Sequence, residues 1–154
     1  MATDFGQFFL SSLPNLMSGL GYTLLLTFIS ITAGFFLGIV LALGRMYGNK
    51  LINGFCVGYI ELFRGTPLLV QLFIIYFGLP SVGIIFSPIE AALLGLALNS
   101  GAYQAEYLRG SIQSVESGQM SAARSLVMNK FQSIQYVILP QALRIAIPAW
   151  SNEF

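Results

Sequence analysis

Charged residues are scarce in this chain, and four of them share one pattern. Glu61-Leu-Phe-Arg64-Gly65 and Glu106-Tyr-Leu-Arg109-Gly110 both read Glu-x-x-Arg-Gly. A three-residue offset places each pair on one helix face, where opposite charges neutralise one another near a membrane boundary. Two interpretations stay open: interfacial anchoring, with the arginine reaching toward water, or a functional role as a cytoplasmic gate or as a ring that supports the polar loop described below. We expect neither pair to be catalytic.

A polar stripe leads into the second of these pairs. Asn99, Tyr103 and Glu106 recur at helical spacing, with Ser100 and Gln104 one position round. Polar side chains at membrane depth face protein or a watery cavity, because lipid offers them no partners. They either form hydrogen bonds between helices or line a pathway for a polar solute. The candidate pathway or gate residues are Glu61, Arg64, Asn99, Tyr103, Gln104, Glu106 and Arg109.

A polar segment, residues 118–140, follows the stripe in this otherwise apolar chain. The spacing predicts a short helix with Ala122, Ala123, Leu126 and Val127 on one side, and Arg124 and Ser125 on another. A second short helix, about 131–138, should stop before Pro140. Small side chains let a helix enter a partner's groove closely, so the segment is a candidate docking element. The alternative is an amphipathic hairpin lying on the membrane surface.

The composition indicates the elements that must position these residues. Hydrophobic residues make up 56% of the 154 residues and charged residues only 8%, whereas a soluble domain has about 25% charged residues. Residues 5–44 and 65–89 carry no charge at all. A membrane helix needs roughly 20 apolar residues, and its backbone groups must be satisfied internally. We therefore predict one all-α, polytopic membrane domain over residues 1–154.

The first two membrane spans are predicted over about 21–43 and 52–79. The first includes Gly34 and Gly38, a spacing that close helix packing explains without any further function. The second is interrupted by Gly65-Thr66-Pro67, so it should be long and bent there.

The third span is predicted over about 89–108, and a fourth begins at about 142–150. A capping signature opens the third span: Ser87 at the N-cap, Pro88 at the first helical position, and Glu90 three residues after the cap. The fourth span reaches the end of the sequence.

The positive charges predict the orientation of these spans. All seven cations fall on one side of a three-span layout, and they are Arg45, Lys50, Arg64, Arg109, Arg124, Lys130 and Arg144. By the positive-inside rule that side is cytoplasmic. The N-terminus is then outside, and the polar segment 118–140 is inside.

Several chemistries are excluded by what the sequence lacks. The chain has no histidine, so histidine-based catalysis and histidine metal sites cannot occur. Cys56 is the only cysteine, so no disulfide or cysteine metal site is expected. No Gly-x-x-x-x-Gly-Lys-Ser/Thr phosphate loop is present. We expect no enzyme activity, no cofactor and no nucleic-acid partner, and any energy source must sit on another chain.

The segment 118–140 resembles the cytoplasmic coupling loop of membrane subunits in bacterial ATP-binding cassette importers. That loop reads Glu-Ala-Ala, three residues, Gly, nine residues, Ile, one residue and Leu-Pro. The matching positions are Ala122, Ala123, Leu139 and Pro140, with Val137 a mild variant of the Ile. Ser121 stands where Glu is usual and Val127 where Gly is usual. The resemblance gives the ATPase-coupling residues as Ser121, Ala122, Ala123, Leu126, Val127, Leu139 and Pro140, within a cytoplasmic loop of residues 110–140.

Two further stretches are similar to polar amino-acid permeases of the same family. Residues 61–80 look like their second membrane helix, and residues 105–119 look like their approach to the coupling loop. The similarity covers about 19–154. It implies a transmembrane subunit of an ATP-driven importer for polar amino acids, working by alternating access in the cell membrane. The implied partners are an ATP-binding cassette ATPase, an extracytoplasmic solute-binding protein and a second permease subunit, identical or different.

The resemblance also sets further expectations. Members of this family continue for two more helices, so we expect the chain to be part of a longer permease and not to transport by itself. Ser121 removes an acceptor for a partner's cation. Because Val127 replaces the residue best suited to a turn, we expect the bend to shift to Asn129. A non-conducting membrane anchor and a passive channel stay open as alternatives. Binding of solute at the polar stripe would distinguish a transporter from an anchor. Dependence of the flux on ATP would distinguish a transporter from a channel.

Overall fold

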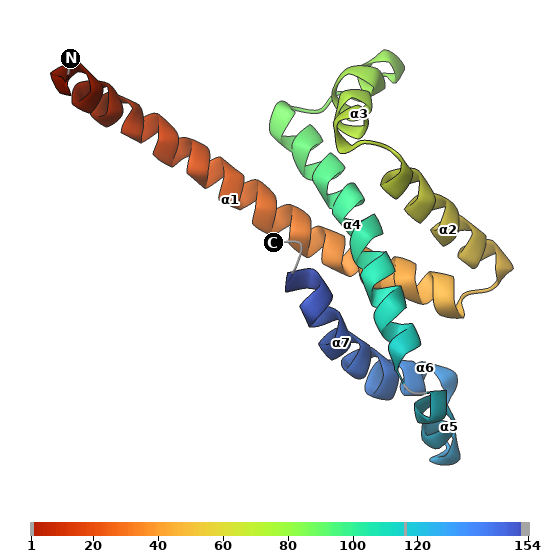
Figure 1. Ribbon diagram of the computed structural model, residues 1–154. Helices are drawn as coiled ribbons and strands as arrows, with labels where there is room; N and C mark the ends of the chain where they lie inside the picture. The colour runs from red at the N-terminus through yellow and green to blue at the C-terminus, as the bar shows by residue number, and fades with distance from the viewer. Residues whose placement is uncertain (1, 116, 152–154) are drawn as a thin grey trace.

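The computed structural model describes the backbone of residues 2–115 and 117–151, and it is helical almost throughout (Figure 1). One long rod, α1, is flanked along its second half by shorter helices, and α4 packs against α1, α2 and α7. The elements are α1 (Ala2–Tyr47), α2 (Lys50–Gly65), α3 (Leu68–Phe73), the π-helix η1 (Ile74–Gly78), the 3₁₀-helix η2 (Leu79–Val82), α4 (Pro88–Ser114), α5 (Ser117–Ser125), α6 (Lys130–Ser133), the π-helix η3 (Ile134–Ile138) and α7 (Leu139–Ser151). The predicted all-α class is confirmed.

Helix α1 is longer than the predicted span 21–43. It has 46 residues, which at 1.5 Å per residue is about 70 Å, more than twice a hydrocarbon core of about 30 Å. Pro14 lies inside it and does not end it. No charged residue interrupts the stretch from residue 5 up to Arg45, so the sequence offered no signal for the true start.

Glycine permits the close packing of α1 on α4. A Cβ atom on Gly34 would lie 2.6 Å from the Oγ of Ser100, and one on Gly38 would lie 2.9 Å from the Cβ of Gln104. Both distances are below van der Waals contact, so any larger side chain would push the helices apart. The packing interpretation of Gly34 and Gly38 is confirmed.

The second predicted span is broken rather than merely bent. Helices α2 and α3, with η1 and η2 continuing α3, meet at an angle of 104°. Thr66 and Pro67 between them are both extended. Proline provides no N–H for a helical hydrogen bond and disfavours helical dihedrals in the residue before it. The predicted position of the interruption is confirmed, but a single helix over 52–79 is wrong.

The third predicted span is α4, and its capping box forms as expected. The Oγ of Ser87 accepts from the N–H of Glu90, and the Glu90 carboxylate accepts from the N–H of Ser87. The helix continues beyond residue 108 to Ser114, so the predicted loop 110–140 begins as the last turns of α4. By length and apolar composition, α1 alone among the described residues qualifies as a membrane span, or α1 and the α2–α3 pair if that bent pair counts as one. Helix α4 falls short because of its polar stripe.

The helix after Asn129 does not stop before Pro140. Helix α6 passes into the π-helix η3 and then directly into α7, so residues 130–151 are helical without a gap. Pro140 is the second residue of α7 and directly follows the π-helix, whose last bond runs from the Leu139 N–H to the Ile134 carbonyl five residues earlier. The predicted end at residue 138 is therefore wrong. The fourth span begins three residues earlier than predicted.

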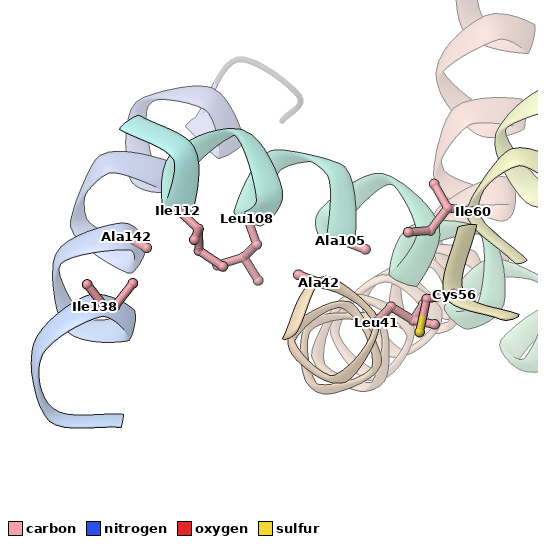
Figure 2. Close-up of a cluster of buried hydrophobic side chains, with 9 residues drawn as sticks. All are labelled: Leu41, Ala42, Cys56, Ile60, Ala105, Leu108, Ile112, Ile138 and Ala142. Atoms are coloured by element: carbon pink, nitrogen blue, oxygen red, sulfur yellow. The ribbon is translucent and has the colours of Figure 1, made fainter. Parts of the chain in front are cut away.

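One apolar cluster joins the helices near the end of α1 (Figure 2). Its buried members are Leu41, Ala42, Cys56, Ile60, Ala105, Leu108, Ile112, Ile138 and Ala142. They come from α1, α2, α4, η3 and α7, so the segment that follows α4 is anchored to the bundle by the same core. Burial of these side chains is what holds η3 and α7 beside α4.

Candidate functional site

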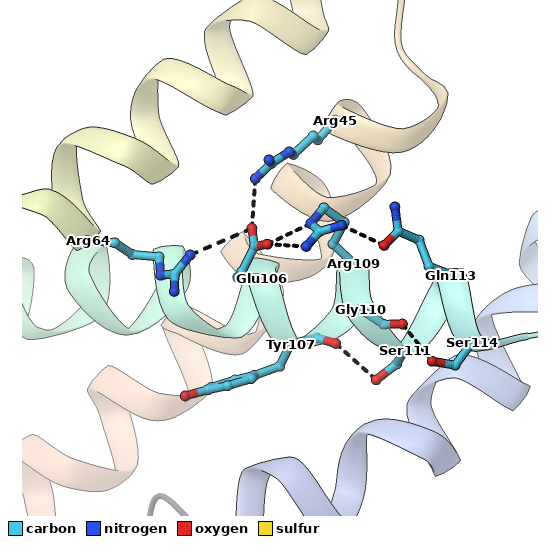
Figure 3. A network of polar contacts seen from close by, with 9 residues as sticks. All are labelled: Arg45, Arg64, Glu106, Tyr107, Arg109, Gly110, Ser111, Gln113 and Ser114. Atoms are coloured by element: carbon cyan, nitrogen blue, oxygen red, sulfur yellow. Dashed lines mark hydrogen bonds and ion pairs between the residues drawn. The ribbon is translucent and has the colours of Figure 1, made fainter.

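Glu106 is the centre of a charged cluster that draws residues from three helices (Figure 3). Arg45, from α1, donates from Nη1 to the Glu106 Oε2 at 2.7 Å. Arg109 donates from Nε to the Oε1 at 2.6 Å. Arg64, at the end of α2, is 3.8 Å from the Oε2. We call Arg45, Arg64, Glu106 and Arg109 the arginine cluster. Three cations and one anion give it a formal charge of +2.

Only one of the two predicted Glu-x-x-Arg pairs forms. Glu106 and Arg109 pair as expected. Glu61 is exposed and has no ion pair among the described residues, because Arg64 reaches across to Glu106 instead. The expected Glu61–Arg64 neutralisation is therefore wrong. Sequence reasoning also missed Arg45 as a partner of Glu106. The one signal in the sequence was that Arg45 is the first charged residue after the uncharged stretch 5–44.

The polar stripe of α4 stabilises the break between α2 and α3. Asn99 Nδ2 donates to the Gln71 Oε1 at 3.1 Å and to the Phe63 carbonyl at 3.3 Å. Gln71 Nε2 donates to the carbonyls of Phe63 and Thr66, at 2.8 and 3.0 Å. A helix end at membrane depth leaves carbonyls without partners, and each is costly unless satisfied. Gln71 is buried, and sequence reasoning did not single it out.

Gln104 and Tyr103 lie on different sides of α4. Gln104 is buried, and its Nε2 donates to the Ile31 carbonyl at 3.2 Å and to the Ser100 Oγ at 2.8 Å. The Tyr103 ring lies under Arg64, with 5.4 Å from the guanidinium carbon to the ring centroid. The two amides, Asn99 and Gln104, thus make the interhelical hydrogen bonds that were one of the two alternatives. A pathway role for the stripe stays a prediction.

The residues predicted to share one apolar side at α5 differ in their exposure to solvent. Ala123 is only 3% exposed, so it faces the protein interior. Ser121 and Ala122 are exposed, and Leu126 and Val127 are exposed by 76% and 92%. The surface available to a partner therefore excludes Ala123. Toward the end of the segment, Leu139 is half-buried and Pro140 exposed.

Val127 makes the turn that ends α5. Its φ is 60°, in the left-handed region, and among the described residues it is the only non-glycine with positive φ. The N–H of Val127 donates to the Arg124 carbonyl, and that of Met128 to the Ala123 carbonyl. These bonds form a Schellman motif, in which glycine is the usual residue at the Val127 position. The expected shift of the bend to Asn129 is wrong: Asn129 instead caps α6, together with Gln132.

Two polar contacts tie this segment to the bundle. Lys130 Nζ donates to the Tyr47 carbonyl at 2.9 Å and lies 5.6 Å from the centroid of the same residue's ring. Gln141 Nε2 donates to the Gln119 Oε1 at 3.4 Å, which links α7 to α5. The segment therefore holds a defined position against the end of α1 instead of lying free.

Long helices around a shared apolar core, with polar groups paired between helices, are typical of polytopic helical membrane proteins. A family described as the binding-protein-dependent transport system inner membrane component matches residues 31–154. The probable amino-acid ABC transporter permease protein YckA of Bacillus subtilis (strain 168) is 47% identical over 93% of this chain and 63% of YckA. The nopaline transport system permease protein NocM of Agrobacterium fabrum (strain C58 / ATCC 33970) is 41% identical over 96% of this chain and 65% of NocM.

The fold agrees with this sequence similarity. The crystal structure of an amino acid ABC transporter with histidines matches with a TM-score of 0.82 and 45% identity, over 94% of this chain and 67% of that chain. The chain belongs to the family of inner membrane components of binding-protein-dependent transport systems. It spans about two thirds of the length of the relatives it matches.

Proposed function

We propose that this chain is the transmembrane subunit of an ATP-driven importer for polar amino acids. It contributes to the translocation pathway and couples to an ATPase on a separate chain. An extracytoplasmic solute-binding protein delivers the amino acid, and a second permease subunit completes the pathway. Relatives named for amino-acid, nopaline and glutamine transport support the substrate class. The observation that carries the proposal is the exposed apolar surface at the turn that ends α5.

That surface, formed by Ala122, Leu126 and Val127, has the properties of a docking site. Ala122 is small and exposed, and the two larger side chains beside it are mostly in solvent. Exposed apolar side chains that cluster mark surfaces a partner covers. The Schellman turn and the contacts of Lys130 and Gln141 hold the surface in place. A movement of the bound partner would therefore also move the helix bundle.

The same surface is proposed to face the cytoplasm. Arg45, Lys50, Arg109 and Lys130 lie where α1 and α4 end and α2 and α6 begin, and these ends gather at one end of the molecule (Figure 1). The positive-inside rule makes that end cytoplasmic and the N-terminus external. Arg64 stands at the far end of α2 from Lys50, but its guanidinium joins Arg45 and Arg109 at the Glu106 carboxylate.

The coupling role is tested with Ala122→Asp in the full-length permease, co-expressed with its ATPase and binding protein. Asp there would place an unpaired charge in the partner's apolar groove, at a cost of several kcal/mol of association. We expect normal insertion, poor co-purification of the ATPase and loss of ATP-driven uptake into proteoliposomes. Ser81→Asp is the matched control, because Ser81 is exposed in η2, outside the coupling segment.

Ala123→Asp is not an equivalent test, since Ala123 is buried within the chain and its substitution would disturb α5 itself. Full ATPase capture and uptake by Ala122→Asp would show that this surface is not the coupling site. If the wild-type complex takes up no amino acid with ATP, the importer proposal fails and a membrane anchor is favoured. Uptake that proceeds equally without ATP would instead indicate a channel.

A further inference from the structure

The arginine cluster has more positive charge than the described chain neutralises. Glu106 is its only carboxylate, and no second acidic side chain of the described residues lies within ion-pair distance of the three guanidiniums. The four side chains are only 18–39% exposed. Uncompensated charge in such surroundings is expensive, because Coulombic and desolvation terms are both large away from bulk water. The cluster is therefore suited to receive an anion.

Arg64 is the member whose hydrogen-bonding capacity is free. Arg45 and Arg109 both donate hydrogen bonds to the Glu106 carboxylate, and Arg109 Nη1 also donates to the Gln113 Oε1 at 2.6 Å. Arg64 is held only by an ion pair at 3.8 Å and by the Tyr103 ring, and it makes no side-chain hydrogen bond within the described residues. It is also the most exposed of the three arginines, at 39%. Its planar fork of N–H donors is thus oriented but unused.

The position of Arg64 is fixed by its neighbours. It is the next-to-last residue of α2, and its Nη1 lies 3.8 Å from the same Glu106 oxygen to which Arg45 of α1 donates. It lies directly before the α2–α3 break, which the hydrogen bonds of Gln71 and Asn99 hold in one geometry. Arg64 is 39% exposed, and a charged side chain in a membrane protein faces protein or water rather than lipid. A rigid break and an anchored ring keep the guanidinium in one place.

We propose that Arg64 binds the α-carboxylate of the transported amino acid. A guanidinium pairs with a carboxylate through two parallel hydrogen bonds, which no ammonium group reproduces. The α-carboxylate is common to all amino acids, so this contact recognises the class and leaves the side chain to other residues. Glu106 occupies Arg45 and Arg109, and an incoming carboxylate lowers the excess charge from +2 to +1. This assignment rests on the proposed importer function.

The test measures binding to the full-length permease–ATPase complex without its solute-binding protein, so that only the membrane subunit recognises the ligand. The probe is the proteinogenic amino acid with the highest ATP-dependent uptake by the wild-type system, labelled with tritium. It is compared, by equilibrium dialysis, with its α-carboxamide, in which a neutral amide replaces the carboxylate. The variants are Arg64→Gln and Arg64→Lys, and Lys50→Gln is the control because Lys50 is an exposed cation outside the cluster.

We expect the wild type and Lys50→Gln to bind the acid at least tenfold more tightly than the carboxamide. Arg64→Gln should abolish this preference by weakening the acid at least tenfold while leaving the carboxamide unchanged, an effect that general misfolding would not produce. Arg64→Lys should fall between them, because it keeps the charge and loses the fork. If Arg64→Gln does not assemble, the Arg64→Lys comparison decides. If either Arg64 variant prefers the acid over the carboxamide as strongly as the wild type does, the assignment is overturned.

A lipid phosphate could satisfy the same guanidinium, so the dialysis is repeated in nanodiscs of phosphatidylcholine alone and with added phosphatidylglycerol. An Arg64-dependent preference for the acid in both supports the carboxylate assignment. No preference for the acid, with Arg64-dependent retention of phosphatidylglycerol, would identify a headgroup site and overturn it. If no amino acid is taken up, the proposed function fails; the dialysis then uses L-glutamine and L-glutaminamide, and it still decides the role of Arg64.

Discussion

Replacing Val127 with glycine should stabilise the turn between α5 and α6. A left-handed residue with a Cβ atom costs about 1–2 kcal/mol, and Val127 has a φ of 60°. Glycine removes that strain but gives the unfolded chain extra freedom worth about 0.4–1 kcal/mol. The Val127 side chain is 92% exposed, so its loss forfeits little burial. The net expected gain is about 0.5–1 kcal/mol.

Hydrogen exchange of the backbone amides at positions 127 and 128 measures this gain locally. These N–H groups donate to the carbonyls of Arg124 and Ala123 at 2.9 and 3.3 Å, so they exchange only when the turn opens. A gain of about 0.5–1 kcal/mol slows their exchange by about two- to fivefold. The measurement uses the detergent-solubilised permease and mass spectrometry of peptides that cover the turn.

Leu126→Gly is the matched control for this prediction. Leu126 is also largely exposed, at 76%, but its φ is not positive. Glycine there relieves no strain and adds only flexibility, so exchange should become faster by the equivalent of about 0.5–1 kcal/mol. Unchanged or faster exchange in Val127→Gly, or an equal slowing in Leu126→Gly, would refute the claim that Val127 stores backbone strain.

Two further predictions concern the break and the orientation. Gln71→Leu should lower the free energy of unfolding by about 1–3 kcal/mol, because the Thr66 carbonyl loses its side-chain donor and the Phe63 carbonyl keeps only Asn99. The exposed Gln135→Leu should change it by less than about 0.5 kcal/mol, and equal melting temperatures for the two variants would contradict the role of Gln71. A reporter inserted at Gly83 should read as external and one at Gly118 as cytoplasmic; the same side for both would remove the proposed topology.

Local chemistry was predictable from the sequence wherever a few adjacent residues determine the backbone. The capping box of Ser87 and Glu90 and the interruption at Thr66-Pro67 both arise from such residues, and both occur where expected. The close approach at Gly34 and Gly38 was also predictable, because only small residues permit it. These features depend on steric rules and not on knowing which helix lies opposite.

The partners of the polar groups were not predictable, because they depend on how the helices are placed. The spacing of Arg64 suits Glu61 equally well, and only the approach of α2 to α4 brings Glu106 within reach. Gln71 lies in α3 and donates hydrogen bonds across the break to carbonyls at the end of α2. No periodicity in the sequence indicates this role. In a helix as short as α5, the spacing also cannot tell the inner face from the outer one. Ala123 and Ala122 were therefore assigned together, although only Ala122 is exposed.

Both π-helices share one sequence pattern, which explains how the chain stays helical past a proline. Ile74-Ile-Tyr-Phe-Gly-Leu-Pro80 and Ile134-Gln-Tyr-Val-Ile-Leu-Pro140 share Ile-x-Tyr-x-x-Leu-Pro. In each, the leucine N–H donates to the isoleucine carbonyl five residues before it. A proline in a regular α-helix would clash with the carbonyl four residues earlier and provide no donor for it. The wider π-turn before the proline moves the backbone out of that register, so the helix continues past both prolines. The residues beyond each proline then determine how far it extends: Gly83, left-handed at φ 86°, ends the first after one 3₁₀ turn, whereas the second has no such residue and continues as α7.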